Sequence, residues 1–176
     1  MIRFERIVQL PPGIQTLRDE ADRDGIRNMG LLVDEWASGT ERFAEPGEAL
    51  FAAFDGDALV GVGGVTIENI VPAMRMRRLY VLRGWRKRGV GRMVAEAMMA
   101  RGFESANLLT CNARPARRRR VLGGDGVRAC KGPGLDPRII ALAPPRNRRR
   151  RPAAPAANAR HRGWTSPSPA CSQDRH

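Results

Sequence analysis

The excess positive charge of this chain lies entirely in its last third. Residues 1–112 contain 15 basic and 15 acidic side chains, whereas residues 113–176 contain 16 basic and 3 acidic ones. Nine of the 13 prolines also lie beyond residue 112. Only the balanced part has the composition of a globular unit, and about 110 residues can bury one hydrophobic core. We therefore predict one domain over residues 1–112 and a separate tail over residues 113–176.

The tail has the composition of a disordered segment. Its basic residues are 15 arginines and one lysine, and they include the runs Arg117–Arg120 and Arg148–Arg151. Such a segment buries too little apolar surface to offset the conformational entropy that folding would cost. We expect residues 113–176 to be disordered.

The first 112 residues show no sign of export or membrane insertion. Charged residues interrupt the first ten positions, and no apolar run approaches the roughly 20 residues of a membrane span. The three cysteines lie far apart and lack the spacing of a zinc site or a disulfide framework. We expect a cytoplasmic protein with reduced cysteines and no metal site.

Hydrophobic patterning predicts a mixture of strands and helices in the first domain. Apolar residues alternate from Ile2 to Leu10 and then recur at helical spacing from Ile14 to Trp36, with one break that favours two helices. Two β-rich runs, Leu50–Phe54 and Leu59–Ile67, flank an Asp-Gly pair that is typical of a tight hairpin.

The strand expected after this hairpin changes its apolar phase half-way. Met74 and Met76 share one parity, whereas Leu79 and Val81 share the other. One extra residue at Arg77–Arg78, a β-bulge, would restore the phase, and bulges often lie beside active sites. A solvated strand end without a bulge explains the pattern equally well.

The pattern then returns to helical spacing. Apolar residues from Val90 onwards predict a helix that ends near Gly102, and Ala106–Cys111 predicts a further strand. The order is therefore strand, two helices, three strands, helix and strand. This order predicts an α/β (α+β) fold in which helices flank one mixed sheet.

A basic stretch with two glycines, Arg86–Arg92 (RKRGVGR), lies between the bulged strand and this helix. The first amides of a helix have no internal partner, so together with the helix dipole they can bind an anion. Glycine lets a phosphate approach the backbone, and the cationic side chains suit a diphosphate. The stretch is neither a GxGxxG fingerprint nor a P-loop. Taken alone, it is equally well a helix start with solvated arginines.

In context, the stretch resembles a known family. An Arg-x-x-Gly-x-Gly pattern after a strand that ends at Val81, followed by a helix and a strand to Asn112, resembles the GNAT superfamily of acyl-CoA-dependent N-acetyltransferases. The likeness follows the element order over residues 1–112 and is specific from about Arg77 onwards. It implies a mixed, mostly antiparallel sheet, and transfer of an acetyl group from acetyl-CoA directly to an amine of a small molecule or protein.

The resemblance also implies where acetyl-CoA would bind. In this family the loop amides hold the pyrophosphate, and backbone groups of the bulged strand hold the pantetheine arm and the thioester carbonyl. Leu79 and Val81 would be the strand contacts, and Asn112 would be a contact at the end of the following strand. The pyrophosphate loop would consist of Arg86, Lys87, Arg88, Gly89, Val90, Gly91 and Arg92.

Acetyl transfer to an amine needs a group that accepts the amine proton. Glu68 follows the third expected strand and is the only carboxylate between Asp57 and Glu96, so it is our candidate base. A solvated acid at a strand end is the simpler interpretation of the same residue. Tyr80 could contribute a hydroxyl, although a tyrosine in a strand more often serves packing.

The likeness stops after Asn112. The family continues with a helix that ends in a Phe-Tyr-Glu-x-x-Gly-Phe-like segment and then a last pair of strands, and the sequence beyond Asn112 shows neither. Reading the codons of Arg117–Arg128 one nucleotide later permits Ala-Ala-Ala-Ala-Phe-Trp-Glu-Ala-Met-Gly-Phe-Glu. We therefore interpret residues 113–176 as a frame-shifted reading of the missing C-terminal helix and strands. The chain as given would leave Leu108–Thr110 as an open sheet edge, and its activity would be doubtful.

A different class of function follows if residues 113–176 are a genuine arginine-rich tail. Arginine runs neutralise phosphates, so the tail would bind RNA or DNA without sequence preference and with a steep dependence on salt. Trp164 is the only aromatic residue of the tail, so base stacking is poorly supplied. Non-specific nucleic-acid binding is therefore the alternative to acetyl transfer.

Overall fold

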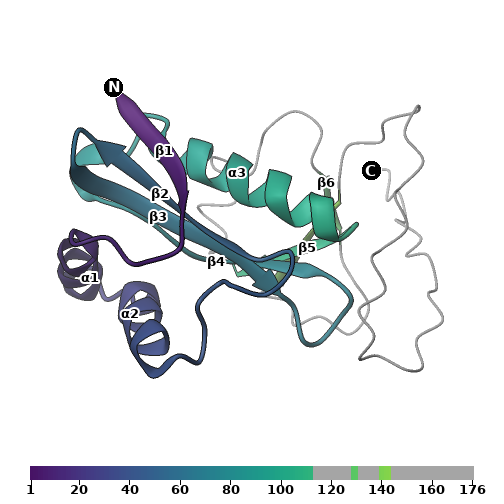
Figure 1. The fold of residues 1–176 in the computed structure, drawn as a ribbon. Coiled ribbons are helices and arrows are strands. Elements are labelled where there is room, and N and C mark those ends of the chain that lie inside the picture. Colours follow the sequence, from purple (N-terminus) through teal and green to yellow (C-terminus); the bar gives the residue numbers. More distant parts are fainter. Residues whose placement is uncertain (113–127, 131–138, 144–176) are drawn as a thin grey trace.

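The structure is a computed structural model that describes residues 1–112, 128–130 and 139–143. These residues form strands, helices and one 3-10 turn, arranged around a single sheet (Figure 1). The strands are β1 (Ile2–Ile7), β2 (Ala49–Asp55), β3 (Ala58–Ile67), β4 (Met74–Val81), β5 (Leu109–Asn112), β6 (Arg128–Cys130) and β7 (Ile139–Ala143). The helices are α1 (Ile14–Arg23), α2 (Asn28–Ser38) and α3 (Val90–Ser105), and the 3-10 turn is Arg83–Trp85.

The sheet has the strand order β1-β2-β3-β4-β5-β7-β6. Strands β4 and β5 run parallel, whereas the other neighbours are antiparallel. The parallel pair is possible because α3 crosses over between the two strands. The expected mixed, mostly antiparallel sheet with flanking helices is confirmed.

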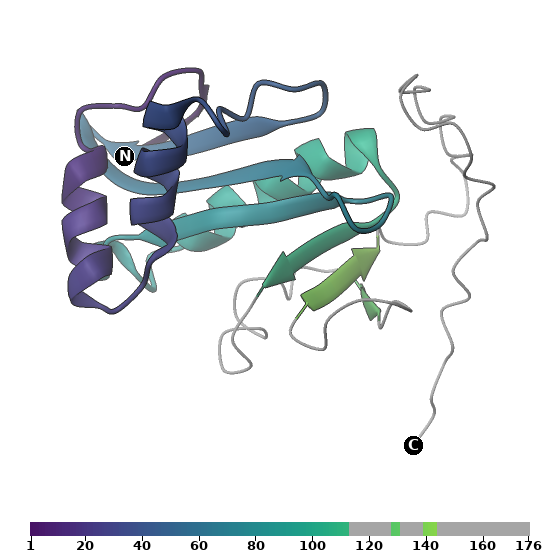
Figure 2. The same cartoon turned by 90° about the horizontal axis from the view of Figure 1, so that it is seen from below.

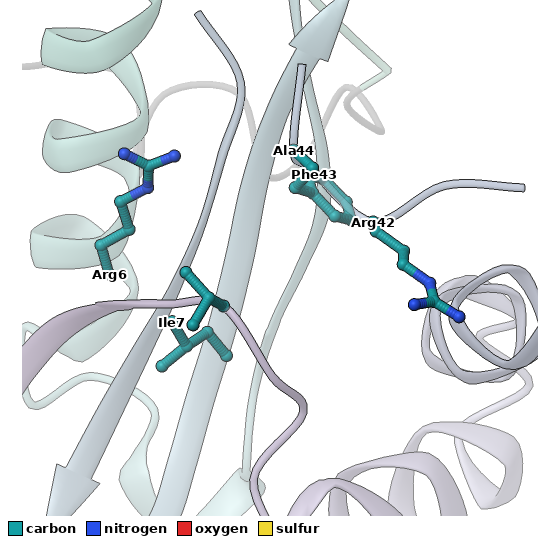
Figure 3. Close-up of a pocket in the computed structure, with 6 residues that line it drawn as sticks. Arg6, Ile7, Arg42, Phe43 and Ala44 are labelled. Carbon is teal, nitrogen blue, oxygen red and sulfur yellow. The ribbon is translucent and has the colours of Figure 1, made fainter. Parts of the chain in front are cut away.

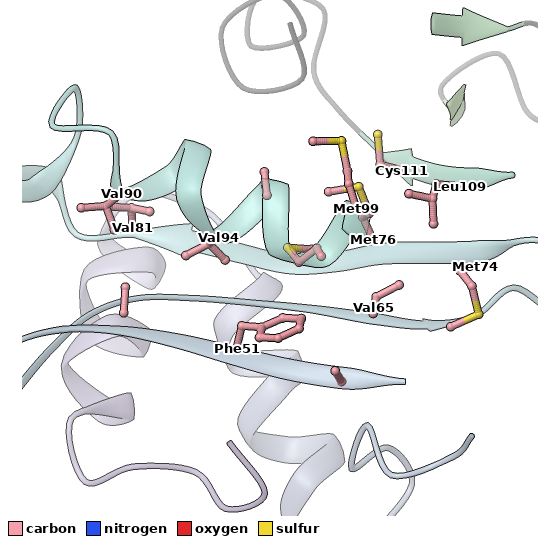
Figure 4. Packing of buried hydrophobic residues seen from close by; sticks show 14 of the residues in the cluster. Phe51, Val65, Met74, Met76, Val81, Val90, Val94, Met99, Leu109 and Cys111 are labelled. Carbon is pink, nitrogen blue, oxygen red and sulfur yellow. The ribbon is translucent and has the colours of Figure 1, made fainter. Parts of the chain in front are cut away.

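Helices cover both faces of the sheet (Figures 1 and 2). On one face, Val94 of α3 packs with Val65 and Met76 of the sheet in a hydrophobic core that Figure 4 shows from close by. On the other face, Leu17 of α1 and Leu32 of α2 belong to a second core. All five side chains are buried, and burial of each such side chain stabilises the fold by about 1.5–3 kcal/mol.

The predicted bulge in β4 is confirmed. Tyr80 pairs with Val62 and Arg77 pairs with Gly64, so two β4 residues, Arg78 and Leu79, lie opposite one β3 residue. Arg78 takes a positive φ of 61°, which lets the chain absorb the extra residue. As a result the apolar side chains on both sides of the bulge face α3, while the side chains of both arginines face α2.

The ends of β1 and α3 differ from the prediction. Strand β1 ends at Ile7 rather than Leu10, because Ile7 pairs with Leu50 close to the start of β2. Helix α3 continues past Gly102 to Ser105. A Cβ at this glycine would lie 2.2 Å from a methyl group of Leu109. Gly102 therefore allows close packing of α3 on β5 instead of ending the helix.

The expectations of an open edge at β5 and of missing C-terminal strands are wrong. Strand β7 pairs with β5 over four residues, and β6 pairs with β7. Leu142 of β7 is only 2% exposed and belongs to the core on the α3 side. Apart from β6 and β7, the predicted disordered or frame-shifted tail covers residues 113–127, 131–138 and 144–176, which lie outside the described residues. The prediction of a missing C-terminal helix concerns these residues too.

None of the helices in the described part of the chain has the length and apolar character needed to cross a membrane.

Candidate active site

Strand β4 has an edge that no described strand covers. Its pairing with β5 stops at Met76 and Cys111, although β4 continues to Val81 (Figure 2). The amide of Leu82 donates to the carbonyl of Val60 at 3.0 Å, so residues 80 and 82 direct their backbone groups toward β3. Backbone groups alternate along a strand, so those of Leu79 and Val81 point to the uncovered side.

Side chains from two other elements reach the carbonyls on this edge. Nδ2 of Asn28, at the start of α2, donates to the carbonyl of Leu79 at 3.0 Å. Nε of Arg86 donates to the carbonyl of Val81 at 2.9 Å. Asn28 was not among the site residues predicted from the sequence, because an asparagine at a helix start ordinarily indicates only a cap.

The basic loop leads from β4 into the start of α3. Lys87 and Gly89 have positive φ values of 67° and 86°, and Gly89 is the N-cap of α3. No side chain caps this helix end, so the first amides of α3 are not used by a capping residue. Free amides at a helix start can, together with the helix dipole, bind an anion. Anion binding at this loop stays a prediction.

The four cationic side chains of the loop are used in different ways. Lys87, Arg88 and Arg92 are exposed. The guanidinium of Arg88 lies over the ring of Trp85 at 4.9 Å, and Arg92 pairs with Glu96 at 3.0 Å along α3. The half-buried Arg86 turns toward the end of α1 instead, where it pairs with Asp24.

Tyr80 lies in the same polar network as Arg86. Its hydroxyl is 3.1 Å from Oε1 of Glu20 and 3.2 Å from Oδ2 of Asp24, and it accepts from Arg86 at 3.0 Å. Burial raises the pKa of Tyr80, and the hydrogen bond to Glu20 raises it further. The hydroxyl is therefore a neutral donor that holds β4 against α1.

Glu68 follows β3 and is nearly buried, with 5% exposure. One carboxylate oxygen accepts the amide of Asn69 at 2.9 Å, and the other accepts the hydroxyl of Thr110 at 2.9 Å. Arg75 lies 3.7 Å from the second oxygen. Glu68 therefore joins the turn after β3 to β5, at the opposite end of β4 from the basic loop.

Arg77 and Arg78, beside and in the bulge, meet carboxylates that were not predicted from the sequence. Nη2 of Arg78 donates to both carboxylate oxygens of Glu35, at 2.5 and 2.6 Å. Arg77 lies 3.6 Å from Glu41, which comes from the loop after α2. A sequence signal did exist, because two adjacent arginines that face the same side of a partly buried strand require nearby acids.

Glu41 has a perturbed pKa. Its carboxylate accepts the amide of Phe43 at 2.8 Å, and its side chain is 17% exposed. Burial raises the pKa of Glu41 above the usual 4.5, and the nearby Glu48 and Glu35 raise it further. The Phe43 amide and Arg77 oppose this shift but do not cancel it. Glu41 is therefore a carboxylate beside the bulge that binds a proton more readily than usual.

A pocket of about 240 Å³ lies between the end of β1 and the loop after α2 (Figure 3). The ring of Phe43 forms part of its wall, and Arg6 and Arg42 lie on opposite sides. The complete lining is Arg6, Ile7, Val8, Arg42, Phe43 and Ala44. None of the site residues predicted from the sequence lines this pocket.

Comparison with known proteins identifies the family. The sequence matches the acetyltransferase (GNAT) family over residues 14–120. The chain belongs to this family. It is thus an N-acyltransferase by family, and the family generally uses acyl-CoA. No curated protein matches the chain in sequence.

Solved structures share the fold of this GNAT chain. A putative acetyltransferase from Exiguobacterium sp. 255-15 superposes with a TM-score of 0.69 at 20% identity, over 82% of this chain and 93% of that one. A putative acyl-CoA N-acyltransferase from Klebsiella pneumoniae gives 0.53 at 15% identity, over 82% and 97%. A putative GNAT acetyltransferase from Desulfovibrio desulfuricans gives 0.52 at 18%, over 81% and 97%.

Proposed function

We propose that this GNAT protein transfers an acetyl group from acetyl-CoA directly to an amine of a small molecule or protein. The observation that carries the proposal is the uncovered edge of β4, which leads directly into the basic loop and the uncapped start of α3. A strand edge offers backbone hydrogen bonds to an amide-containing arm, and the helix start offers amides to a diphosphate. Acetyl-CoA carries both groups in this order.

The contacts of the loop refine the proposed roles of its residues. The amides around Gly89, Val90 and Gly91 would hold the diphosphate, and the exposed Lys87, Arg88 and Arg92 would add charge. Leu79 and Val81 would contact the pantetheine arm through their amides, because their carbonyls already accept side-chain donors. Asn112 is exposed where β5 leaves β4, and it would contact the ligand from the other side.

The transfer itself requires removal of a proton from the acceptor ammonium. Acetyl-CoA supplies the activated acetyl group, and the amine nitrogen forms the new bond as the thiolate leaves. Glu68 is the candidate from the sequence, but both of its oxygens accept hydrogen bonds from its own surroundings. Glu41 is a second candidate, because its pKa is raised and it lies beside the bulge.

Binding tests the proposal first. Acetyl-CoA should raise the melting temperature of the full-length protein in proportion to the logarithm of its concentration once the site is saturated. The control is ATP at matched concentration, which carries phosphates but no thioester arm and should give a smaller shift. A protein that is folded by circular dichroism and gives no shift with acetyl-CoA would contradict the proposal.

Transfer is then measured as release of the free CoA thiol with a panel of primary amines: a polyamine, a lysine-containing peptide and an aminoglycoside. Glu41→Gln and Glu68→Gln are compared with the wild type. The variant that lowers turnover while retaining acetyl-CoA affinity identifies the proton acceptor. Unchanged turnover in both variants would remove both carboxylates from the mechanism.

The nucleic-acid alternative gains no support from the described residues. It rests on Arg117–Arg120 and Arg148–Arg151, which lie outside them. A salt-sensitive gel shift of random-sequence RNA by the full-length protein, lost when both runs are changed to glutamine, would favour it.

A further inference from the structure

Helix α1 is tied to the basic loop by a dense polar network. Asp24, directly after α1, has a side chain only 6% exposed. Its Oδ2 accepts from Arg86 at 2.9 Å and lies 3.2 Å from the hydroxyl of Tyr80, while its Oδ1 accepts from Arg83. Glu20, one helical turn earlier, accepts the backbone amide of Arg83 at 2.7 Å.

These contacts converge on the segment that connects β4 to α3. Arg86 uses its Nε for the carbonyl of Val81 and a terminal nitrogen for Asp24, so its guanidinium bridges β4 and α1. Arg83 is held both through its backbone and through its side chain. Two carboxylates therefore face two arginines, and this pairing compensates for the burial of the Asp24 side chain.

The network limits what Arg86 can do for a ligand. Its guanidinium is directed toward α1 and is engaged with three acceptors: the Val81 carbonyl, Asp24 and the Tyr80 hydroxyl. Arg86 is the first residue of the basic loop and the residue that follows the 3-10 turn. Its side chain therefore fixes the position from which the loop backbone starts.

We propose that Asp24 and Glu20 of the α1 end are positioning residues for the diphosphate-binding loop, and that Arg86 serves the ligand through this anchor. By holding Arg83 and Arg86, the two carboxylates set the direction of the amides at the start of α3. The inference rests on the proposed function, because it assumes that these amides bind the diphosphate of acetyl-CoA. It assigns to α1 a role in cofactor binding, although none of its residues belongs to the loop.

The first test is Asp24→Asn in the full-length protein, with the Kd for acetyl-CoA measured by calorimetry well below the melting temperature. The expected result is a loss of affinity of about ten-fold to a hundred-fold, as for small displacements of binding groups. The matched control is Asp22→Asn in α1, whose side chain is 54% exposed and lies 3.9 Å from Arg18. A residue that merely stabilised the fold would lower the melting temperature and leave the Kd of folded protein unchanged.

A double-mutant cycle distinguishes an anchor from a direct ligand. If Arg86 acts through Asp24, Asp24→Asn and Arg86→Gln combined should weaken acetyl-CoA binding no more than the stronger single change. If Arg86 contacts a phosphate independently, the two losses multiply, and this result overturns the inference. Should Asp24→Asn not fold, Glu20→Gln replaces it in the same cycle.

The outcomes separate the two proposals. A wild-type protein that does not bind acetyl-CoA refutes the proposed function. A wild type that binds, together with an Asp24→Asn variant of unchanged Kd, refutes only the role of α1.

Discussion

Polar side chains line one whole face of β4, the face toward α1 and α2. Each of them meets a carboxylate that comes from a different place in the chain. The pairs are Arg75 with Glu68, Arg77 with Glu41, Arg78 with Glu35, and Tyr80 with Glu20. Partly buried charges are tolerated here because each is paired. At the scale of single residues, each acid beside β4 is therefore accommodated according to how deeply it is buried and which side chain it pairs with.

Glu41 should make stability depend on pH. Its pKa in the folded protein is raised, so the folded state favours the protonated form, and stability falls as pH rises through the folded pKa. Glu41→Gln keeps an acceptor for the Phe43 amide but cannot ionise. Its melting temperature relative to wild type should therefore increase from about pH 4 to about pH 7. The exposed Glu45→Gln in the same loop is the matched control, and equal trends in both variants would contradict the assignment.

Gly64 should tolerate no side chain. A Cβ at this position would lie 2.3 Å from Cε1 of Phe43, whose ring is buried against the strand. Gly64→Ala should lower the free energy of unfolding by about 1–3 kcal/mol, because the core is already filled. Gly84→Ala is the control, since nothing lies within 4 Å of its added Cβ. Denaturant unfolding measures both, and equal stabilities would show that the Phe43 ring moves freely.

At the scale of elements, the start of α3 has two functions that can be separated. The helix must begin at Val90, and in the proposed function its first amides must also remain accessible to a diphosphate. Gly91 is the second residue of α3, and a Cβ there would meet only a methyl group of Val81 at 3.5 Å, an ordinary contact. The protein itself therefore leaves room for alanine at this position. Any loss of acetyl-CoA affinity must come from contact of the added methyl group with the ligand.

Gly91→Ala should thus change stability and affinity in opposite directions. Alanine favours a helix over glycine by up to about 1 kcal/mol, so the melting temperature should rise or stay equal. Acetyl-CoA affinity should fall, because the methyl group blocks close approach of the diphosphate. The matched control is Gly30→Ala in the first turn of α2, which should gain stability without losing affinity. Retained affinity in Gly91→Ala would argue against a diphosphate at this helix end.

At the scale of the whole molecule, strand β7 decides whether the sheet continues beyond β5 or ends there. Leu142 brings a side chain from far along the chain into the core on the α3 side. The sequence predicted that residues 113–176 form a tail outside the fold. The pairing of β7 with β5 instead makes it part of the sheet.

Leu142→Ala should therefore destabilise the protein by about 2–5 kcal/mol, the usual cost of a buried leucine. Leu31→Ala, at a position that is 39% exposed, should change the unfolding free energy by about 0.5 kcal/mol or less. Chemical unfolding of the full-length variants gives both values. If Leu142→Ala leaves the free energy of unfolding unchanged, β7 contributes nothing to the core and residues beyond 112 are a separate tail.

The sequence by itself determined the order of elements over residues 1–112 and the place of the basic loop. It left the bulge as one of two interpretations, and the pairing of β3 with β4 decided between them. Apolar periodicity is a local property, and the phase change around Arg77 is visible because alternation along a strand has a period of two. Only the tertiary structure decided which acids meet which arginines. Arg78 and Glu35 are 43 positions apart, and Arg86 and Asp24 are 62 apart. Charged side chains carry no period that marks a partner, so such pairs form only after packing brings distant elements together.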